Sequence, residues 1–258
     1  NGRCEEIRTL KVGYWLPCNL QLLVDASMFV QGSEFACISE DARSALLAAL
    51  SSTIYGNNEV VYFQDDEAAH LYFVTSGFVR LSYLMEDGSA ILYAILPPGN
   101  SFGELGILDG GLHCDMATGI GQTVIASIAS KRFESLCSRY PELNSALAQL
   151  VARRYRSYID LARIMSLKTL PARVAQALLR IADMLGTHIR HGGRELLCVG
   201  PVVTQADLGL MARGARGNVN RALKEWQRSG WIAIKNRSIL IIDREALETL
   251  AFEESINA

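Results

Sequence analysis

The chain has 258 residues, of which 50% are hydrophobic, and its 25 Lys and Arg nearly balance its 27 Asp and Glu. This length and composition predict a globular protein with room for two domains. A membrane-spanning helix needs about 18 consecutive uncharged apolar residues. No stretch of the sequence is that long, so no transmembrane helix is expected. The six cysteines are irregularly spaced, which favours reduced thiols in the cytoplasm over a disulfide framework.

Residues 1–33 are predicted to form an N-terminal extension. They lack the basic start, the apolar centre and the small-residue cleavage site of a signal peptide. Three consecutive apolar residues, Tyr14, Trp15 and Leu16, are expected to cover part of the following domain.

Residues 34–140 are predicted to form a β-rich domain. It opens with an amphipathic helix over 39–50, with Ser39 as the N-cap and Leu46, Leu47 and Leu50 on its apolar face. Hydrophobic runs then alternate with turns rich in Gly, Asp and Pro, and Ser76 with Gly77 is one of these turns. The predicted strands cover 59–63, 70–74, 78–84, 90–96 and 123–128. Many short strands of this kind are typical of a small barrel or jelly roll.

A long helix is predicted over 141–167, with Pro141 in its first turn and a hinge at 167–170. One apolar stripe consists of Leu143, Leu147, Leu150, Leu161 and Ile164. A second stripe consists of Val151, Tyr155, Tyr158, Ala162 and Met165. A helix with two apolar sides must bury both, so one side is expected to pack on its own domain and the other on a second copy. Charged residues at Leu150 and Leu161 are then expected to give monomers. The alternative is a core helix of a single chain.

Residues 169–258 are predicted to form a helical domain. Thr169 caps a helix over 171–185, and 186–193 is predicted to be a polar loop. Thr204 caps a second helix, with Asp207 in its first turn, and Gly214 interrupts the pattern. A third helix over 216–228 buries Val219, Leu223 and Trp226. Two β-type runs, 231–235 and 238–242, flank a turn at Asn236 and Arg237, and 246–252 closes the chain as a helix. This order is that of a winged helix-turn-helix.

Charge is segregated along the chain. Residues 203–237 contain seven Lys and Arg against two Asp and Glu, a net charge of +5, whereas 34–140 has a net charge of −8. A basic segment favours phosphates, and Arg and Asn can recognise guanine and adenine in a major groove. The predicted base contacts are Arg216, Asn218, Asn220 and Arg221. The predicted phosphate contacts are Thr204, Lys224, Lys235 and Arg237. The alternative is an ordinary helical hairpin with a solvated basic face.

Residues 203–242 resemble the DNA-binding domain of the Crp/Fnr family, the relatives of the cyclic-AMP receptor protein and the fumarate–nitrate regulator. The match is closest in TQADL, in Arg216, Val219 and Arg221, and in the wing. The order of turns and the sequence FGELG at 102–106 resemble the cyclic-nucleotide-binding β-roll of the same family. The resemblance covers roughly 54–243. It implies an α+β fold with an N-terminal β-roll, a long dimerisation helix and a C-terminal winged helix-turn-helix. Residues of the dimerisation helix are then Leu143, Leu147, Leu150, Tyr158, Leu161 and Met165.

The resemblance also implies an effector pocket, in which FGEL opens a phosphate-binding cassette. Gly103 and Glu104 match that pattern. Cys114 stands where the family has the phosphate-binding Arg, and Asp115 where it has a small hydroxyl residue. Losing the charge-assisted contact removes about 1.5–3 kcal/mol, and no Lys or Arg lies between Arg80 and Lys131 to replace it. Tyr158 and Ile159 stand at the adenine-contacting Thr–Ser positions. We therefore expect no control by cyclic AMP.

Cofactors known in the family match this sequence poorly. An iron–sulfur cluster would use Cys4, Cys18 and Cys37 with Cys114 as the fourth ligand, but the gaps of 14 and 19 residues are far longer than the loops of such sites. His113 beside Cys114 offers a haem-ligand pair, but adjacency is weak support, and a solvated loop histidine is expected. No cofactor is predicted.

The predicted function is a homodimeric, sequence-specific transcription regulator of bacterial type. Its partners would be double-stranded DNA with a near-palindromic operator, RNA polymerase if it activates, and an unidentified small-molecule effector. The alternative is a ligand-sensing, redox-sensing or partner-binding scaffold whose DNA domain no longer binds. No Ser/His/Asp order, P-loop or metal-ligand repeat is present, so no enzyme activity is expected.

Overall fold

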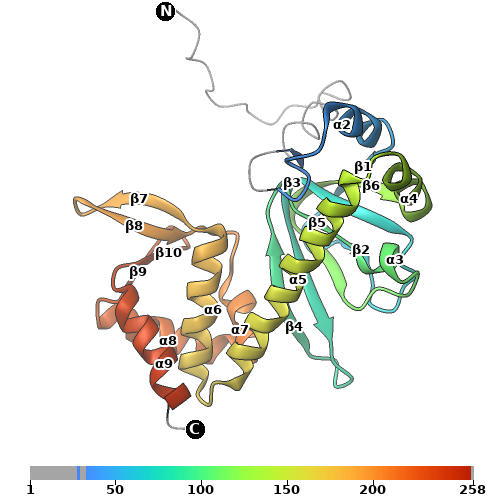
Figure 1. Ribbon diagram of the computed structural model, residues 1–258. Coiled ribbons are helices and arrows are strands. Elements are labelled where there is room, and N and C mark those ends of the chain that lie inside the picture. Colours follow the sequence, from blue (N-terminus) through green and yellow to red (C-terminus); the bar gives the residue numbers. More distant parts are fainter. Residues whose placement is uncertain (1–27, 30–32, 257–258) are drawn as a thin grey trace, which may run out of the picture.

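The computed structural model describes residues 28–29 and 33–256, so Cys4, Tyr14, Trp15, Leu16 and Cys18 lie outside the described residues. A β-roll and a mainly helical domain are joined by one long helix, α5 (Glu142–Ser166), which runs between them in Figure 1. This arrangement confirms the predicted fold class. Within the described residues, no helix combines the length and apolarity needed to span a membrane.

The β-roll is built around two long antiparallel strands, β3 (His70–Leu84) and β6 (Met116–Ala129). Its sheet has the order β1-β6-β3-β4, with β2 on β6 and β5 on β3. The remaining strands are β1 (Ser51–Tyr55), β2 (Val60–Tyr62), β4 (Ala90–Leu96) and β5 (Ser101–Phe102).

The turn predicted at Ser76 and Gly77 is wrong, because β3 continues through it with an irregular register. Gly77 has a φ of 77°, and an added Cβ would lie 2.6 Å from the Gln122 carbonyl oxygen. Only glycine fits this combination of left-handed backbone and close approach. A glycine inside a strand therefore marks a bulge here, which the sequence pattern does not distinguish from a turn.

Short helices accompany the sheet, and those in residues 33–140 are α2 (Glu40–Leu47), α3 (Leu105–Leu108) and α4 (Ser130–Arg139). The Ser39 hydroxyl accepts a hydrogen bond from the Ala42 amide, which confirms the predicted cap. The helix α4 was not predicted, although Phe133 and Cys137 are buried one turn apart. Phe35 packs edge-on against Phe73 and Phe133 in the core.

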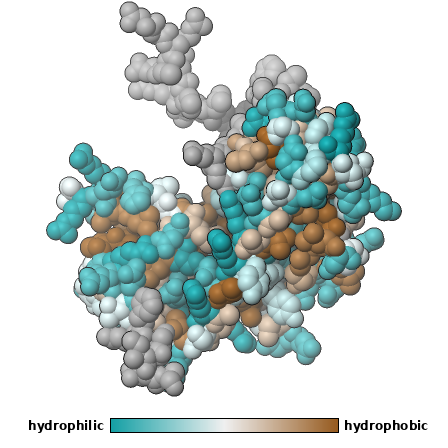
Figure 2. Space-filling view, viewed as in Figure 1, coloured by the Kyte–Doolittle hydropathy of each residue, from teal (hydrophilic) through white to brown (hydrophobic). Residues whose placement is uncertain are grey.

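The long helix α5 has two unlike sides. Leu143, Leu147 and Leu150 are buried in the core of the β-roll, and Ile164 is buried in the core of the other domain. On the outward side Tyr155 is 66% exposed and Ile159 is 38% exposed. Figure 2 shows a hydrophobic patch on this face of the β-roll, in the area of α3 and α5. The leucine stripe is therefore internal, whereas the outward side of α5 has no partner among the residues that the structure describes.

The C-terminal domain contains the four helices α6 (Leu170–Leu185), α7 (Gln205–Ala212), α8 (Arg216–Arg228) and α9 (Arg244–Ile256) and a sheet of order β7-β8-β10-β9. Its strands are β7 (Thr187–His191), β8 (Arg194–Val199), β9 (Ile232–Lys235) and β10 (Ser238–Ile241). The loop predicted over 186–193 is wrong, because this segment forms β7 and the turn of the protruding β7–β8 hairpin (Figure 1). Gly192 and Gly193 have positive φ values at that turn.

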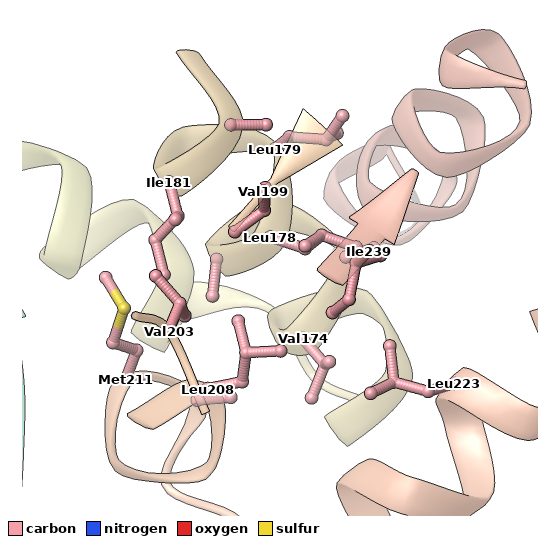
Figure 3. Close-up of a cluster of buried hydrophobic side chains, with 14 of the residues drawn as sticks. Val174, Leu178, Leu179, Ile181, Val199, Val203, Leu208, Met211, Leu223 and Ile239 are labelled. Carbon is pink, nitrogen blue, oxygen red and sulfur yellow. The ribbon is translucent and has the colours of Figure 1, made fainter. Parts of the chain in front are cut away.

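One hydrophobic core fixes the helices of this domain relative to each other. Figure 3 shows side chains from α6, α7, α8 and the sheet converging in it. The labelled members include Val174, Leu178, Ile181, Val199, Val203, Leu208, Met211, Leu223 and Ile239. Because buried side chains are packed to crystal-like density, this core determines how α8 is presented to the surface.

Candidate nucleic-acid interface and effector pocket

The two helices α7 and α8 form the helix-turn-helix. Thr204 is the N-cap of α7, as predicted, and it forms a capping box with Asp207, because each side chain accepts a hydrogen bond from the other residue's amide. Arg213 ends α7 in a left-handed conformation with a φ of 48°. The Gly214 amide then donates to the Gly209 carbonyl over 2.8 Å, and α8 begins two residues later.

The helix α8 has the bounds that were predicted, and Val219, Leu223 and Trp226 are buried. Arg216, Asn218, Arg221 and Lys224 are exposed. This basic and amide-rich face is suited to base edges and phosphates in a major groove. Its first turn contains no acidic residue, so no carboxylate on α8 opposes an incoming phosphate there.

Two predicted contact residues face other groups. Asn220 is half-buried, and its Oδ1 accepts a hydrogen bond from Gln205 Nε2 over 3.5 Å. The Thr204 hydroxyl donates to Asp207 Oδ2 over 2.8 Å and accepts from the Asp207 amide over 3.2 Å. Asn220 therefore links α8 to α7, and the Thr204 side chain stabilises the first turn of α7. Their contacts with DNA stay predictions.

The wing lies beside the helix-turn-helix. Asn236 and Arg237 have φ values of 50° and 65° in the tight turn between β9 and β10, and Lys235 and Arg237 are exposed. A concave surface of about 490 Å³ is lined by residues of α7, α8 and the wing, including Thr204, Arg216 and Arg237. The fold thus brings together three of the predicted DNA-contacting residues, which are separated in the sequence.

The predicted effector pocket is filled by its own side chains. The cavity has a volume of only about 10 Å³. Its lining includes five of the predicted residues, Gly103, Glu104, Cys114, Asp115 and Tyr158, together with Tyr62, Tyr93, Leu105 and His113. Such a volume corresponds to about one water molecule. Ile159 does not line this cavity, because it projects from the outward side of α5. The resemblance places Ile159 in the pocket across the dimer, and this role stays a prediction.

Asp115 is held by two tyrosines. Its carboxylate accepts a hydrogen bond of 2.8 Å from the Tyr62 hydroxyl and another from the Tyr93 hydroxyl. Burial, followed by the charge of Asp115, raises the pKa of both tyrosines well above the ordinary value. Both phenols therefore stay protonated and remain donors to a carboxylate that occupies the predicted phosphate region.

A cation that the sequence prediction missed is paired with one of the residues that line the pocket. Arg154 of α5 pairs with Glu104 over 3.2 Å and donates to the Ser101 carbonyl over 3.0 Å, and both charged side chains are buried. Burial lowers the pKa of Arg154, but Glu104 together with Tyr93, Tyr62 and Asp115 more than offsets this, so the pKa is raised overall. Glu104 is therefore the partner of Arg154 in a buried ion pair. The sequence did contain a sign that this Arg is buried, because Arg154 lies one helical turn from both Leu150 and Tyr158 on the internal side of α5.

His113 and Cys114 lie at the edge of the pocket. His113 is buried and stacks on Tyr62 with ring centroids 3.5 Å apart, so the expected solvated histidine is wrong. Burial lowers the pKa of His113 and raises the pKa of Cys114, whose Sγ lies 3.6 Å from the Tyr158 hydroxyl. In residues 28–29 and 33–256, His, Cys, Asp and Glu form no group of three or more that could hold a metal ion.

Known proteins match this chain over both domains. A cyclic nucleotide-binding domain model matches residues 53–140, and a Crp-like helix-turn-helix domain model matches residues 172–250. A CRP-like cAMP-activated global transcriptional regulator of Mycobacterium tuberculosis is 30% identical over 83% of this chain and 93% of its own length. The chain belongs to the Crp/Fnr family.

Other Crp/Fnr proteins support the same placement. The cyclic AMP receptor protein of Thermus thermophilus is 27% identical over 80% of this chain and 90% of its own length. The structure of FixK2 from Bradyrhizobium japonicum is similar with a TM-score of 0.66 and 25% identity, over 78% of this chain and 96% of FixK2. This Crp/Fnr protein is accordingly a DNA-binding transcription regulator.

Proposed function

We propose that this Crp/Fnr regulator binds a near-palindromic operator as a homodimer and that cyclic AMP does not control it. The observation that carries the second part is the filled effector pocket. Pockets for small ligands usually have volumes of about 300–1,000 Å³, whereas this one has about 10 Å³. A cyclic nucleotide would have to displace buried side chains and place its phosphate beside the carboxylate of Asp115.

The pocket departs from a nucleotide site in charge as well as in volume. Arg154 is already paired with Glu104, and Cys114 offers a thiol with a raised pKa instead of a cation. The Mycobacterium tuberculosis relative is described as cAMP-activated; we propose that this chain does not share that response. DNA binding would then be constitutive or would follow another signal, such as an unidentified effector or oxidation of Cys114.

The outward side of α5 supports the homodimer. Tyr155 and Ile159 are exposed one turn apart, and Ala152 and Ala162 flank them. A two-fold related copy would bury these apolar groups. Leu150 and Leu161 are not suitable probes, because Leu150 is buried in the β-roll core and Leu161 packs against it. The expectation that charges at these two positions would give monomers is replaced by a test at Tyr155 and Ile159.

The cyclic AMP proposal predicts a null result in calorimetry. Titration of cyclic AMP into the protein at micromolar concentration should give no binding heat, and the nucleotide should not change affinity for a duplex selected from a random library. The matched positive control is the Mycobacterium tuberculosis relative under the same buffer conditions. Micromolar cyclic AMP binding that strengthens duplex binding would contradict the proposal.

The two kinds of DNA contact should separate in a selection experiment. Arg221→Ala should cost about 1–3 kcal/mol and relax base preference at one position of each half-site, because Arg221 lies on the exposed face of α8. Arg237→Ala should weaken all sequences alike and reduce the salt slope by about one unit, because the wing is suited to phosphate. Arg132→Ala, which removes an exposed charge on α4, is the control. A changed preference in Arg237→Ala with none in Arg221→Ala would reverse these roles.

The remaining partners follow from the same proposal. RNA polymerase would be a partner if the protein activates transcription, and no cofactor is proposed. The competing function is a ligand-sensing, redox-sensing or partner-binding scaffold whose DNA domain does not bind. Salt-dependent retention on a random-DNA column favours the regulator, because phosphate contacts release counterions. Absence of retention at low salt would favour the scaffold.

A further inference from the structure

The β-roll and the DNA-binding domain share one hydrophobic seam. Leu92 and Ile95 of β4 belong to the same buried cluster as Leu208 and Met211 of α7, and Phe78 of β3 packs against it. The first helix of the helix-turn-helix therefore rests directly on the effector domain and does not depend on the hinge at 167–170 alone.

An ion pair lies at this seam. Arg80 of β3 donates from Nε to Asp207 Oδ1 over 2.6 Å and from Nη2 to Asp207 Oδ2 over 3.3 Å. The two side chains are only 13% and 4% exposed. Arg80 Nη1 also donates to Asn58 Oδ1 over 3.2 Å. A two-point Arg–carboxylate contact fixes orientation as well as distance.

Asp207 is also the second member of the capping box at the start of α7, in which Thr204 is the N-cap. Its Oδ2 accepts from the Thr204 amide over 2.7 Å and from the Thr204 hydroxyl over 2.8 Å. The adjoining residues Thr204 and Gln205 line the concave surface shared with Arg216 and Arg237. A carboxylate without a cation partner at this place would oppose a DNA phosphate. Arg80 neutralises that charge and also holds α7 in place.

With α7 packed on the β-roll, Arg216, Asn218 and Arg221 on the DNA-facing side of α8 are exposed. The contact between the two domains therefore leaves α8 accessible to DNA. We propose that Arg80, a residue of the effector domain, is a positioning residue for DNA binding that acts through Asp207. This inference rests on the proposed DNA-binding function. It means that the β-roll itself fixes the helix-turn-helix in the position in which it binds DNA.

The test is a double-mutant cycle on the full chain, with a duplex that the unmodified protein selects from a random library. Arg80→Gln and Arg80→Met should each weaken duplex binding by roughly 5- to 150-fold, the usual range of coupling between sites. Arg80→Met retains the apolar part of the side chain in the seam, so it serves if Arg80→Gln does not fold. Arg132→Gln, which removes an exposed charge from α4, should bind normally.

The second arm of the cycle uses Asp207→Asn, which keeps a capping side chain. In that background the substitution at Arg80 should have little further effect, because the charge that it compensates is gone. Far-ultraviolet circular dichroism at the assay temperature confirms that each variant is folded. Two outcomes would overturn the inference. One is that Arg80→Met binds the duplex as tightly as the unmodified protein. The other is that the Arg80 substitution reduces duplex affinity by the same factor in the Asp207→Asn background as in the unmodified protein. Failure of the unmodified protein to select any duplex would instead overturn the proposed function.

Discussion

Replacing Glu104 with Gln should lower the free energy of unfolding by about 3–5 kcal/mol, the usual cost of removing one partner from a buried ion pair. Glu104 and Arg154 are both buried and 3.2 Å apart. Because the guanidinium of arginine is so basic that it does not deprotonate in proteins, Arg154 stays charged after the substitution. It would keep its hydrogen bond to the Ser101 carbonyl but lose its closest carboxylate. Urea unfolding followed by circular dichroism measures the change.

Two further variants show whether the loss comes from the unpaired charge. Glu134→Gln removes an exposed carboxylate from α4 and should change stability by no more than about 0.5 kcal/mol. Arg154→Met in the Glu104→Leu background removes both charges and should recover most of the stability, because well-packed apolar residues can replace a buried pair. A Glu104→Gln variant that loses less than about 1 kcal/mol would show that the pair is screened or dispensable.

Replacing both Tyr155 and Ile159 with Glu should convert the protein to monomers in analytical ultracentrifugation. On a two-fold axis each substitution occurs twice, so four carboxylates would be brought together where apolar groups are expected to meet. The operator affinity should then fall by about 10²–10⁴-fold, because two half-sites could no longer be bound as one unit. Both side chains are exposed in the single chain, so its fold should be preserved.

The matched control is Ile54→Glu, an equally apolar residue of β1 that is 47% exposed and lies outside α5. It should remain dimeric and bind the operator with unchanged affinity. If the Tyr155→Glu, Ile159→Glu variant still sediments as a dimer, the subunit contact lies elsewhere. If it is monomeric but binds the operator normally, the two-half-site interpretation is wrong.

The sequence by itself determined the winged helix-turn-helix in considerable detail. The bounds of α8 follow from the apolar positions Val219, Leu223 and Trp226, and the start of α7 follows from Thr204 and Asp207. The Asn236–Arg237 turn also lies where it was predicted. Caps, helical periodicity and tight turns depend on residues a few positions apart, so a short window of sequence contains their cause. Gly77 is a position where a short window of sequence is not sufficient. A bulge and a turn both favour glycine, so the sequence did not show which of the two forms there.

Only the tertiary structure decided which charges meet. Glu104 and Arg154 are 50 residues apart, and Arg80 and Asp207 are 127 residues apart. Their pairing depends on how α5 packs on the sheet and how α7 packs on β4, which no local pattern encodes. The same holds for Asp115, whose neighbours Tyr62 and Tyr93 come from β2 and β4. The sequence indicated that the phosphate-binding Arg was missing; the packing of distant elements determined that the pocket would be closed and internally paired.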